Sequence, residues 1–316
     1  MHSVPFGPTG SRVPNVVAGM MRIADKTDED IRALYTAARD AGIDFFDHAD
    51  LYGFNHPGGG PHLCESRFSS ALGLSTAERE QITLQTKTGI VSEDWHYDSS
   101  YDHIVASAER SLRALDTDYI DVLLIHRPDA LVEPAEVARA FDDLESAGKV
   151  RAFGVSNHTP RQIELLKSAV RQPIVANQLQ LSIAHAPIIT QGLASNMSTE
   201  PGAATIDGGG IIDYCRLNNV TVQAWSPFQK GSRDGVFLGS DDYPELNSEL
   251  DRLAAEYGAT PTAIATAWIT RHPAAMQVVL GTTRAQRVSE AAAGSDLPLT
   301  RSEWYGLVQA AGHHVP

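Results

Sequence analysis

Short apolar runs alternate along the chain with longer segments in which apolar residues recur every three or four positions. The short runs are typical of buried parallel strands, and the longer segments are typical of amphipathic helices. The pattern predicts strands at 15–20, 43–47, 82–87, 119–126, 152–155, 173–178, 220–224 and 277–280. It predicts helices at 28–41, 64–72, 101–115, 134–147, 159–169, 209–218, 245–257, 260–271, 284–293 and 301–311.

Eight strand–helix units in a row favour an α/β fold closed as a (β/α)₈ TIM barrel over a doubly wound sheet. The 316 residues suit one such barrel, and no change of composition divides them, so we expect a single domain over 1–316. Two long loops contain several glycines, at 53–63 and 191–208. The first follows a strand end and either shapes a pocket or is a surface insertion. For the second, a surface insertion is the favoured interpretation.

Composition excludes several classes of partner. The chain has 25 Lys and Arg against 39 Asp and Glu, a net charge of −14, which argues against nucleic-acid and anionic membrane surfaces. It has no apolar run of about 18 residues and no secretory signal at its start. Its two cysteines form no disulfide framework, and we expect a cytoplasmic protein.

Polar side chains with useful chemistry follow several of the predicted strands. Asp47 ends the second strand and Tyr52 follows it, Lys87 ends the third, and His126 ends the fourth. The active site of a TIM barrel is assembled from the carboxyl ends of different strands. A nearby ammonium favours a phenolate, so Lys87 could lower the pKa of Tyr52, with Asp47 holding Lys87 in place.

Each of these residues also has a plainer interpretation. Asp47 and Lys87 could form an ion pair that only closes the barrel, and a single histidine after an apolar run is more often a core residue. The functional interpretation of His126 gains support from the three other residues with complementary acid–base roles. A neutral His126 could then hydrogen-bond a substrate oxygen while Tyr52 donates a proton to it.

Five motifs occur in order at strand ends: Asp47-X-Ala49-X-X-Tyr52, Lys87, Leu124-Ile125-His126, Gly154-Val155-Ser156-Asn157 and Asn177-Gln178. With them, the chain resembles the aldo-keto reductase superfamily from about Val17 to Glu290. Within it, the chain is most similar to bacterial oxidoreductases that carry Asp-His-Ala-Asp, Ile-His-Arg-Pro-Asp and Ala-Trp-Ser.

The resemblance implies NADPH-dependent reduction of an aldehyde or ketone to an alcohol. Tyr52 matches the general acid, Lys87 and Asp47 match the partners that tune its pKa, and His126 matches the residue that orients the substrate. The implied partner is a small carbonyl compound, and the implied state is a monomer or weak homo-oligomer. An alternative is an NADPH-binding redox sensor or regulatory subunit with little turnover.

The resemblance also implies the residues that hold the cofactor. Those near the nicotinamide are Gly19, Met20, Met21, Asp47, Ser156, Asn157, Gln178 and Trp225. Those expected over the pyrophosphate are Ser226, Phe228 and Lys230, and those at the adenosine end are Thr282, Arg284, Arg287 and Glu290.

Two departures from the family pattern concern this set. Trp225 replaces a stacking aromatic that is commonly Tyr, and Gly281 stands where a Lys is common. Plainer interpretations are core packing for Trp225 and both methionines, and solvated side chains for the two arginines. The Gly208-Gly209-Gly210 run lacks the spacing of a phosphate-binding fingerprint.

The sequence does not identify the substrate. Phe54, Trp95 and Arg127 are candidates for the wall of the substrate pocket. The histidines at 48, 56, 62, 96 and 103 have no partner at the spacing of a metal site on a predicted helix, so we expect no metal and no metal-dependent hydrolase.

Overall fold

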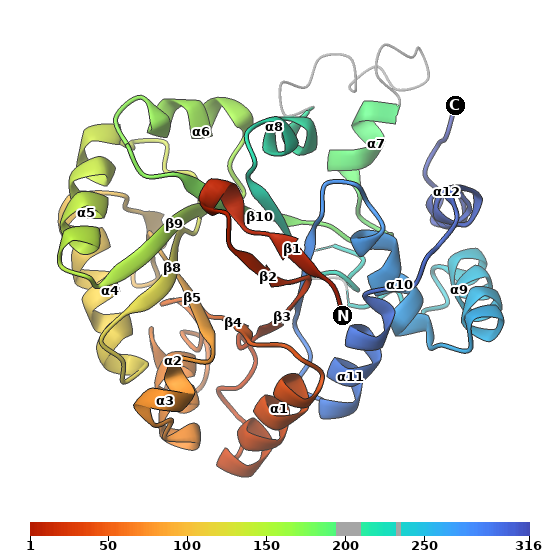
Figure 1. Ribbon diagram of the computed structural model, residues 1–316, viewed down its shortest axis with the longest axis horizontal. Coiled ribbons are helices and arrows are strands. Elements are labelled where there is room, and N and C mark those ends of the chain that lie inside the picture. Colours follow the sequence, from red (N-terminus) through yellow and green to blue (C-terminus); the bar gives the residue numbers. More distant parts are fainter. Residues whose placement is uncertain (194–209, 232–234) are drawn as a thin grey trace.

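The computed structural model describes residues 1–193, 210–231 and 235–316. Eight parallel strands form a closed barrel in the order β10-β11-β12-β3-β4-β5-β8-β9, with helices around it (Figure 1). The predicted TIM barrel is confirmed. Its strands are β3 (Val16–Gly19), β4 (Phe45–Asp47), β5 (Thr83–Thr88), β8 (Ile120–Ile125), β9 (Val150–Ser156), β10 (Ile174–Gln180), β11 (Thr221–Trp225) and β12 (Gln277–Leu280).

The predicted helices form with their ends shifted by a few residues. They are α1 (Asp28–Asp40), α2 (Leu63–Leu72), α4 (Tyr101–Ala114), α5 (Pro134–Ser146), α6 (Pro160–Lys167), α8 (Ile211–Leu217), α9 (Pro244–Tyr257), α10 (Pro261–Thr270), α11 (Ala285–Gly294) and α12 (Arg301–Ala310). Residue 209, the predicted start of the helix at 209–218, lies outside the described residues.

Local sequence explains where these helices begin and which face they bury. At α1 the Thr27 hydroxyl accepts from the Asp30 backbone N–H at 3.1 Å, and the Asp30 carboxylate accepts from the Thr27 N–H at 3.2 Å. This capping box satisfies two donors that the first turn leaves free. The stripe of Ile31, Leu34 and Ala38 then packs into the core.

Several short elements were not predicted from the sequence, because they are too short to show a period. An antiparallel hairpin, β1 (Ser3–Pro5) and β2 (Arg12–Pro14), lies across the middle of the barrel in Figure 1, with the 3₁₀ turn η1 (Gly7–Thr9) between its strands. A second hairpin pairs β6 (Ile90–Val91) with β7 (His96–Tyr97). The others are α3 (Thr76–Arg79) and α7 (Pro187–Leu193). The predicted loop at 191–208 therefore begins within α7, and its residues 194–208 lie outside the described residues.

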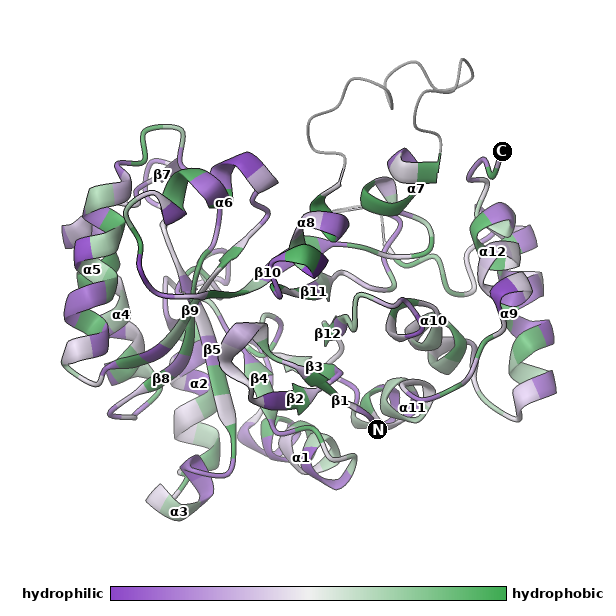
Figure 2. Cartoon of the chain, turned by 45° about the horizontal axis from the view of Figure 1, so that its top comes forward, coloured by the Kyte–Doolittle hydropathy of each residue, from purple (hydrophilic) through white to green (hydrophobic). Residues whose placement is uncertain are grey.

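Apolar side chains gather in two layers. One cluster lies between the strands and the outer helices, whose colouring alternates between hydrophobic and hydrophilic in Figure 2. The other fills the end of the barrel near the hairpin, where the rings of Phe6 and Phe45 meet edge to face at 5.7 Å. This packing closes one end of the barrel and leaves the other end for the polar residues of the site.

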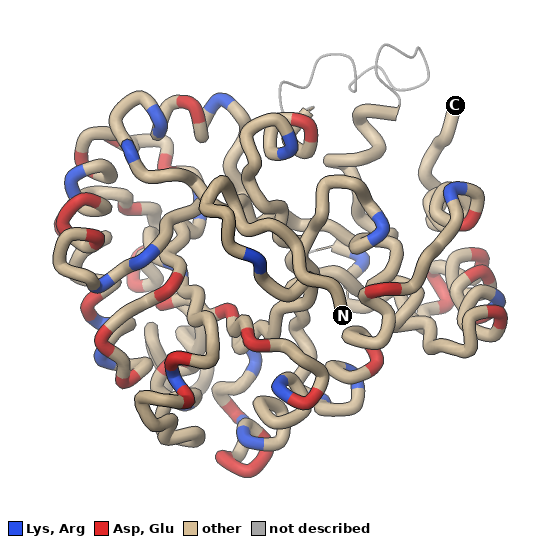
Figure 3. The backbone as a smooth tube through the Cα atoms, viewed as in Figure 1, with Lys and Arg blue, Asp and Glu red and all other residues tan. Residues whose placement is uncertain are grey.

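The charged residues lie mainly on the outer helices and loops, with both signs interspersed (Figure 3). Among the described residues, no helix has the length and apolar character needed to cross a bilayer.

Candidate active site

The predicted catalytic residues meet at the carboxyl ends of neighbouring strands. Asp47 ends β4 and pairs with Gln85 of β5, and Lys87 of β5 pairs with Leu124 of β8. His126 directly follows β8, and Tyr52 lies in the loop after β4. Parallel pairing in this register brings residues that are far apart in sequence to one rim.

Lys87 is the centre of this cluster and is fully buried. Its ammonium group donates to both carboxylate oxygens of Asp47 at 2.7 Å, to the His48 carbonyl at 2.7 Å and to the Tyr52 hydroxyl at 3.2 Å. Buried charges need a partner and full hydrogen bonding. The predicted contacts among Asp47, Lys87 and Tyr52 therefore all exist in the fold.

The ionisation of Tyr52 differs from the sequence-based expectation. Burial is the largest influence and raises the pKa of the phenol above its usual value, Lys87 acts in the opposite direction, and Asp47 raises the pKa again. The net direction is upward, whereas the sequence suggested a lowered value. Tyr52 is therefore protonated at neutral pH, as a proton donor must be.

Lys87 is charged and His126 is neutral. Burial alone would lower the pKa of Lys87, but Asp47 and Tyr52 outweigh it, so its pKa lies above the ordinary value and the ammonium persists. Burial, then the charges of Lys87 and Arg127, hold the pKa of His126 well below its ordinary value. The imidazole is neutral, and its ring meets that of Tyr52 edge to face at 6.1 Å.

A chain of buried amides holds Asp47 from inside the barrel, and the sequence analysis missed it. Gln85 and Gln178 donate to Asp47 Oδ1 at 2.6 and 3.0 Å. Both also donate to Gln223, which in turn donates to Gln277 at 2.9 Å. A signal was present for Gln178, Gln223 and Gln277, since each is a polar residue within a strand that is otherwise mostly apolar, whereas the strand of Gln85 is itself mostly polar.

Carboxylates also support the site from outside the barrel. Glu65 accepts from Thr86 at 2.6 Å and from Ser111 at 3.1 Å, and it lies 2.6 Å from His62 Nδ1. Asp50 accepts from Ser107 at 2.7 Å, while burial raises its pKa to about 7. The contact of His62 with Glu65 fastens the end of the loop at 53–63, and the next residue, Cys64, donates its backbone N–H to the Tyr52 carbonyl at 3.1 Å. The loop therefore ends beside Tyr52, which supports the interpretation that it shapes the site.

Four of the residues expected at the nicotinamide lie together at the ends of β9, β10 and β11. Asn157, with a left-handed φ of 60°, accepts from the Trp225 indole N–H at 3.0 Å and donates to Ser156 Oγ at 2.8 Å. Ser156 in turn donates to the Gln178 carbonyl at 2.9 Å. The amide nitrogen of Gln178 donates to Asp47 and Gln223. In the described part of the chain, the Oε1 atom of Gln178 has no protein partner. That oxygen can accept from a bound carboxamide.

The segment after β11 carries the residues expected at the pyrophosphate. Ser226 has a left-handed φ of 55° and donates to Gln229 at 2.6 Å. Phe228 packs against the outer core, and Lys230 pairs with Asp242. An anion at this place would have to compete with Asp242 for Lys230.

The residues expected at the adenosine end lie where β12 leads into α11. Arg284 is the N-cap residue of α11, and its backbone N–H donates to Thr282 Oγ1 at 3.1 Å. Arg284 and Arg287 are both exposed. Glu290, one turn further on, accepts from Gln286 at 2.8 Å. Two guanidinium groups near a helix N-terminus fit a phosphate.

The first rim segment has little room for side chains. A Cβ on Gly19 would lie 2.3 Å from the Leu280 carbonyl oxygen, so only glycine fits where β3 meets β12. Met20 is 1% exposed and Met21 is 52% exposed. Met20 is therefore a core residue in this structure, and Met21 is accessible to a ligand.

Two of the three candidates for the substrate pocket contact each other, and the third lies beside Trp225. Phe54 and Trp95 lie with ring centroids 5.4 Å apart, and both are exposed. The Arg127 guanidinium lies 5.7 Å from the centre of the Trp225 ring. Within the described ranges, no group of three or more His, Cys, Asp or Glu residues is placed to hold a metal ion.

Comparison with known proteins identifies the family of this chain. The sequence profile of the "Aldo/keto reductase family" matches residues 15–311. The chain belongs to this family.

Two curated bacterial relatives match this family member over nearly its whole length. The uncharacterized oxidoreductase YcsN of Bacillus subtilis (strain 168) is 35% identical over 314 residues, which cover 95% of each chain. A 6-dehydroglucose reductase of Agrobacterium fabrum is 34% identical over 307 residues, 94% of this chain and 93% of the relative. The protein is thus an oxidoreductase of the aldo-keto reductase type, a family that uses NAD(P)H and acts on small carbonyl compounds.

A solved structure shows the same fold. The thermostable aldo-keto reductase Tm1743, in complex with epalrestat, superposes with a TM-score of 0.76 at 24% identity. The match covers 98% of this chain and all of the other.

Proposed function

We propose that this aldo-keto reductase uses NADPH to reduce an aldehyde or ketone to an alcohol, with Tyr52 as the general acid. The observation that carries the proposal is the hydrogen bond of 3.2 Å between the buried Lys87 ammonium and the Tyr52 hydroxyl. A buried phenol donates a proton readily only if its phenolate is stabilised, and a buried ammonium supplies that stabilisation.

The protein residues divide the work at the carbonyl oxygen. When bound, the reduced nicotinamide supplies a hydride to the carbonyl carbon. The C=O π electrons become the new O–H bond with the proton from Tyr52. Lys87 holds the phenolate that remains, and Asp47 keeps Lys87 charged and in place. Neutral His126 can donate a hydrogen bond to the same oxygen and so orient the substrate.

The residues present fit a nicotinamide dinucleotide. The free Oε1 of Gln178 can accept from the carboxamide, and the Trp225 ring can stack on the nicotinamide. Arg284 and Arg287 would hold a 2′-phosphate with Thr282, and this pair supports NADPH over NADH. Ser156 and Asn157 already form hydrogen bonds with each other and with neighbouring residues. We therefore propose that they shape this pocket and also contact the carboxamide.

The substrate wall is assigned to Phe54, Trp95 and Arg127. We expect an enzyme that acts as a monomer or weak homo-oligomer. Cys64 and Cys215 are both free and buried, which agrees with the predicted cytoplasmic location.

The test is a panel of aldehydes, ketones and keto acids assayed by NADPH absorbance. It includes 6-dehydroglucose, because the Agrobacterium relative is named as a reductase of that sugar. We expect at least one carbonyl compound to be reduced with turnover that depends on NADPH. NADPH binding with negligible turnover across the panel would instead support the redox-sensor alternative.

A further inference from the structure

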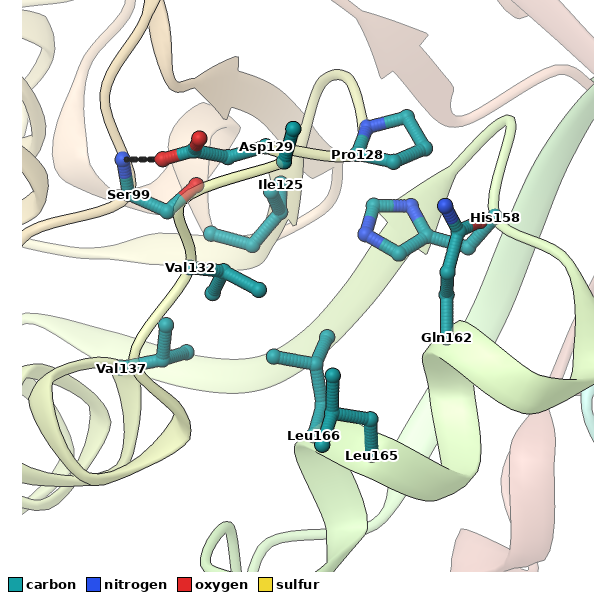
Figure 4. Close-up of a pocket in the computed structure, with 11 residues that line it drawn as sticks. Ser99, Ile125, Pro128, Asp129, Val132, Val137, His158, Gln162, Leu165 and Leu166 are labelled. Atoms are coloured by element: carbon teal, nitrogen blue, oxygen red, sulfur yellow. Dashed lines mark hydrogen bonds between the residues drawn. The ribbon is translucent and has the colours of Figure 1, made fainter.

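A cavity of about 200 Å³ lies outside the barrel, between the ends of β8 and β9 and the helices α5 and α6. We call it the loop cavity. Its apolar wall includes Ile125, Val132, Val137 and Leu166. Its polar side chains are Ser99, Asp129, His158 and Gln162, of which Ser99 and His158 lie on different sides (Figure 4). None of these residues was assigned above to the substrate or the cofactor.

His158 offers a hydrogen-bond acceptor to this space. The residue is 4% exposed, and its Nδ1 lies 2.9 Å from the Ser156 carbonyl oxygen, which can only accept. Nδ1 therefore carries the proton and Nε2 carries a lone pair. Burial lowers the pKa of His158 to about 4, so the ring stays neutral. In the described part of the chain Nε2 has no partner, and Figure 4 shows the ring reaching toward the cavity.

Ser99 is a second polar residue at the cavity, on another side from His158. The residue is 2% exposed, and its hydroxyl has no hydrogen-bond partner among the described residues. Its backbone N–H donates to Asp129 Oδ2 at 3.0 Å, while Asp129 Oδ1 accepts from Leu131. A buried hydroxyl without a partner is costly, so Ser99 offers a second donor to any guest that reaches it.

We propose that the loop cavity binds a compact, uncharged molecule with an apolar body and a hydroxyl group, of about the size of phenol. A dry cavity of about 150 Å³ is large enough for benzene, so the volume allows one ring with a substituent. The hydroxyl would donate to His158 Nε2, and the ring would pack on the aliphatic side chains. The carboxylate of Asp129 in the wall disfavours an anion.

Such a guest would touch both loops that lead into the active site. His158 directly follows Asn157, whose amide donates to the His126 carbonyl at 3.4 Å, and Asp129 lies three residues after His126. We expect a bound guest to change the rate of carbonyl reduction without competing with the substrate. This consequence rests on the proposed function, whereas binding itself is measured on the protein without substrate or cofactor.

The experiment is calorimetric titration of the full chain with phenol, benzene and benzoate. Val132→Phe fills the cavity. Leu131→Phe is the matched control, because Leu131 is the neighbouring residue and is 86% exposed. We expect saturable phenol binding to the wild type and to Leu131→Phe, at least tenfold weaker binding to Val132→Phe, and no benzoate binding. Benzene should bind about threefold to tenfold more weakly than phenol, the effect of one hydrogen bond.

A second variant keeps the test decisive if Val132→Phe does not fold. His158→Phe retains a ring but removes the acceptor, so it should reduce phenol affinity to that of benzene. Absence of saturable phenol binding to the folded wild type below about 10 mM would show that the cavity holds water only, and would overturn the proposal. Phenol binding that Val132→Phe and His158→Phe leave unchanged, and that a carbonyl substrate displaces, would place phenol in the active site and also overturn it.

Discussion

The Lys87 ammonium donates a hydrogen bond of 3.2 Å to the Tyr52 hydroxyl from a fully buried position. Burial raises the pKa of Tyr52, and Lys87 is the main influence that opposes it. Burial thus keeps the phenol protonated in the resting protein, and Lys87 places a positive charge beside the oxygen that becomes negative when the proton leaves. This relationship links the fold to the proposed chemistry.

Tyr52→Phe keeps the ring and removes only the proton donor. We expect carbonyl reduction to fall at least about a hundredfold, the usual range for general acid catalysis. NADPH should bind almost normally, as measured by fluorescence titration. Tyr305→Phe on α12 is the matched control, since Tyr305 lies at the surface, and it should keep full activity. Retained turnover in Tyr52→Phe would rule out the proposed mechanism.

The sequence was sufficient to predict the barrel and the meeting of the four residues that we propose as catalytic. Strand and helix periods identify the β/α units, and parallel strands bring their carboxyl ends to one rim. Asp47, Lys87 and His126 stand at such ends, so their proximity followed from topology alone. The position of Tyr52 near this rim could be predicted because only a few residues separate it from Asp47.

Other features depend on three-dimensional burial, which a single sequence does not contain. The net pKa direction of Tyr52 depends on how strongly burial outweighs Lys87. The amide chain from Gln85 through Gln223 to Gln277 joins three strands whose inward faces are fixed only when the barrel closes. The N-terminal hairpin was missed because strands of three residues show no alternation.

Cofactor choice is tested by Arg287→Ala. If Arg287 holds the 2′-phosphate, NADPH binding should weaken by roughly 1.5–3 kcal/mol, the scale of a hydrogen bond to a charged group. NADH binding should change little. Arg301→Ala, which removes another exposed arginine, controls for the change in net charge and should affect neither cofactor. An equal loss for both cofactors in a fluorescence titration would make Arg287 structural.

The pH dependence of stability is tested by Asp50→Asn. Burial raises the pKa of Asp50 to about 7, well above the ordinary value of about 3.9 in the unfolded chain. Between these values the folded protein binds more protons than the unfolded one, so stability falls as pH rises. The effect of this one group is roughly 4 kcal/mol at most, at 1.36 kcal/mol for each pH unit.

The measurement is the free energy of unfolding at pH 5 and pH 7.5. The wild type should lose stability between these values, and Asp50→Asn should lose less, because Asn does not titrate. Ser107→Ala is a useful companion, since it removes the hydroxyl that favours the carboxylate and should steepen the loss. An identical pH dependence in the wild type and Asp50→Asn would show that Asp50 titrates in its ordinary range.

Lys87→Met separates the catalytic role of Lys87 from its structural one. The change leaves Asp47 buried without its ion-pair partner, which typically costs about 3–5 kcal/mol. Asp47 keeps hydrogen bonds from Gln85 and Gln178, so we expect the low end of that range and a barrel that still folds.

Because Lys87 opposes the rise in the Tyr52 pKa, removal of Lys87 should move the alkaline limb of the pH–rate profile to higher pH and should lower turnover. Thermal melting and the profile are measured on the same sample and compared with those of the wild type. A lower melting temperature with an unchanged profile, once the folded fraction is corrected, would mean that the pair only closes the barrel.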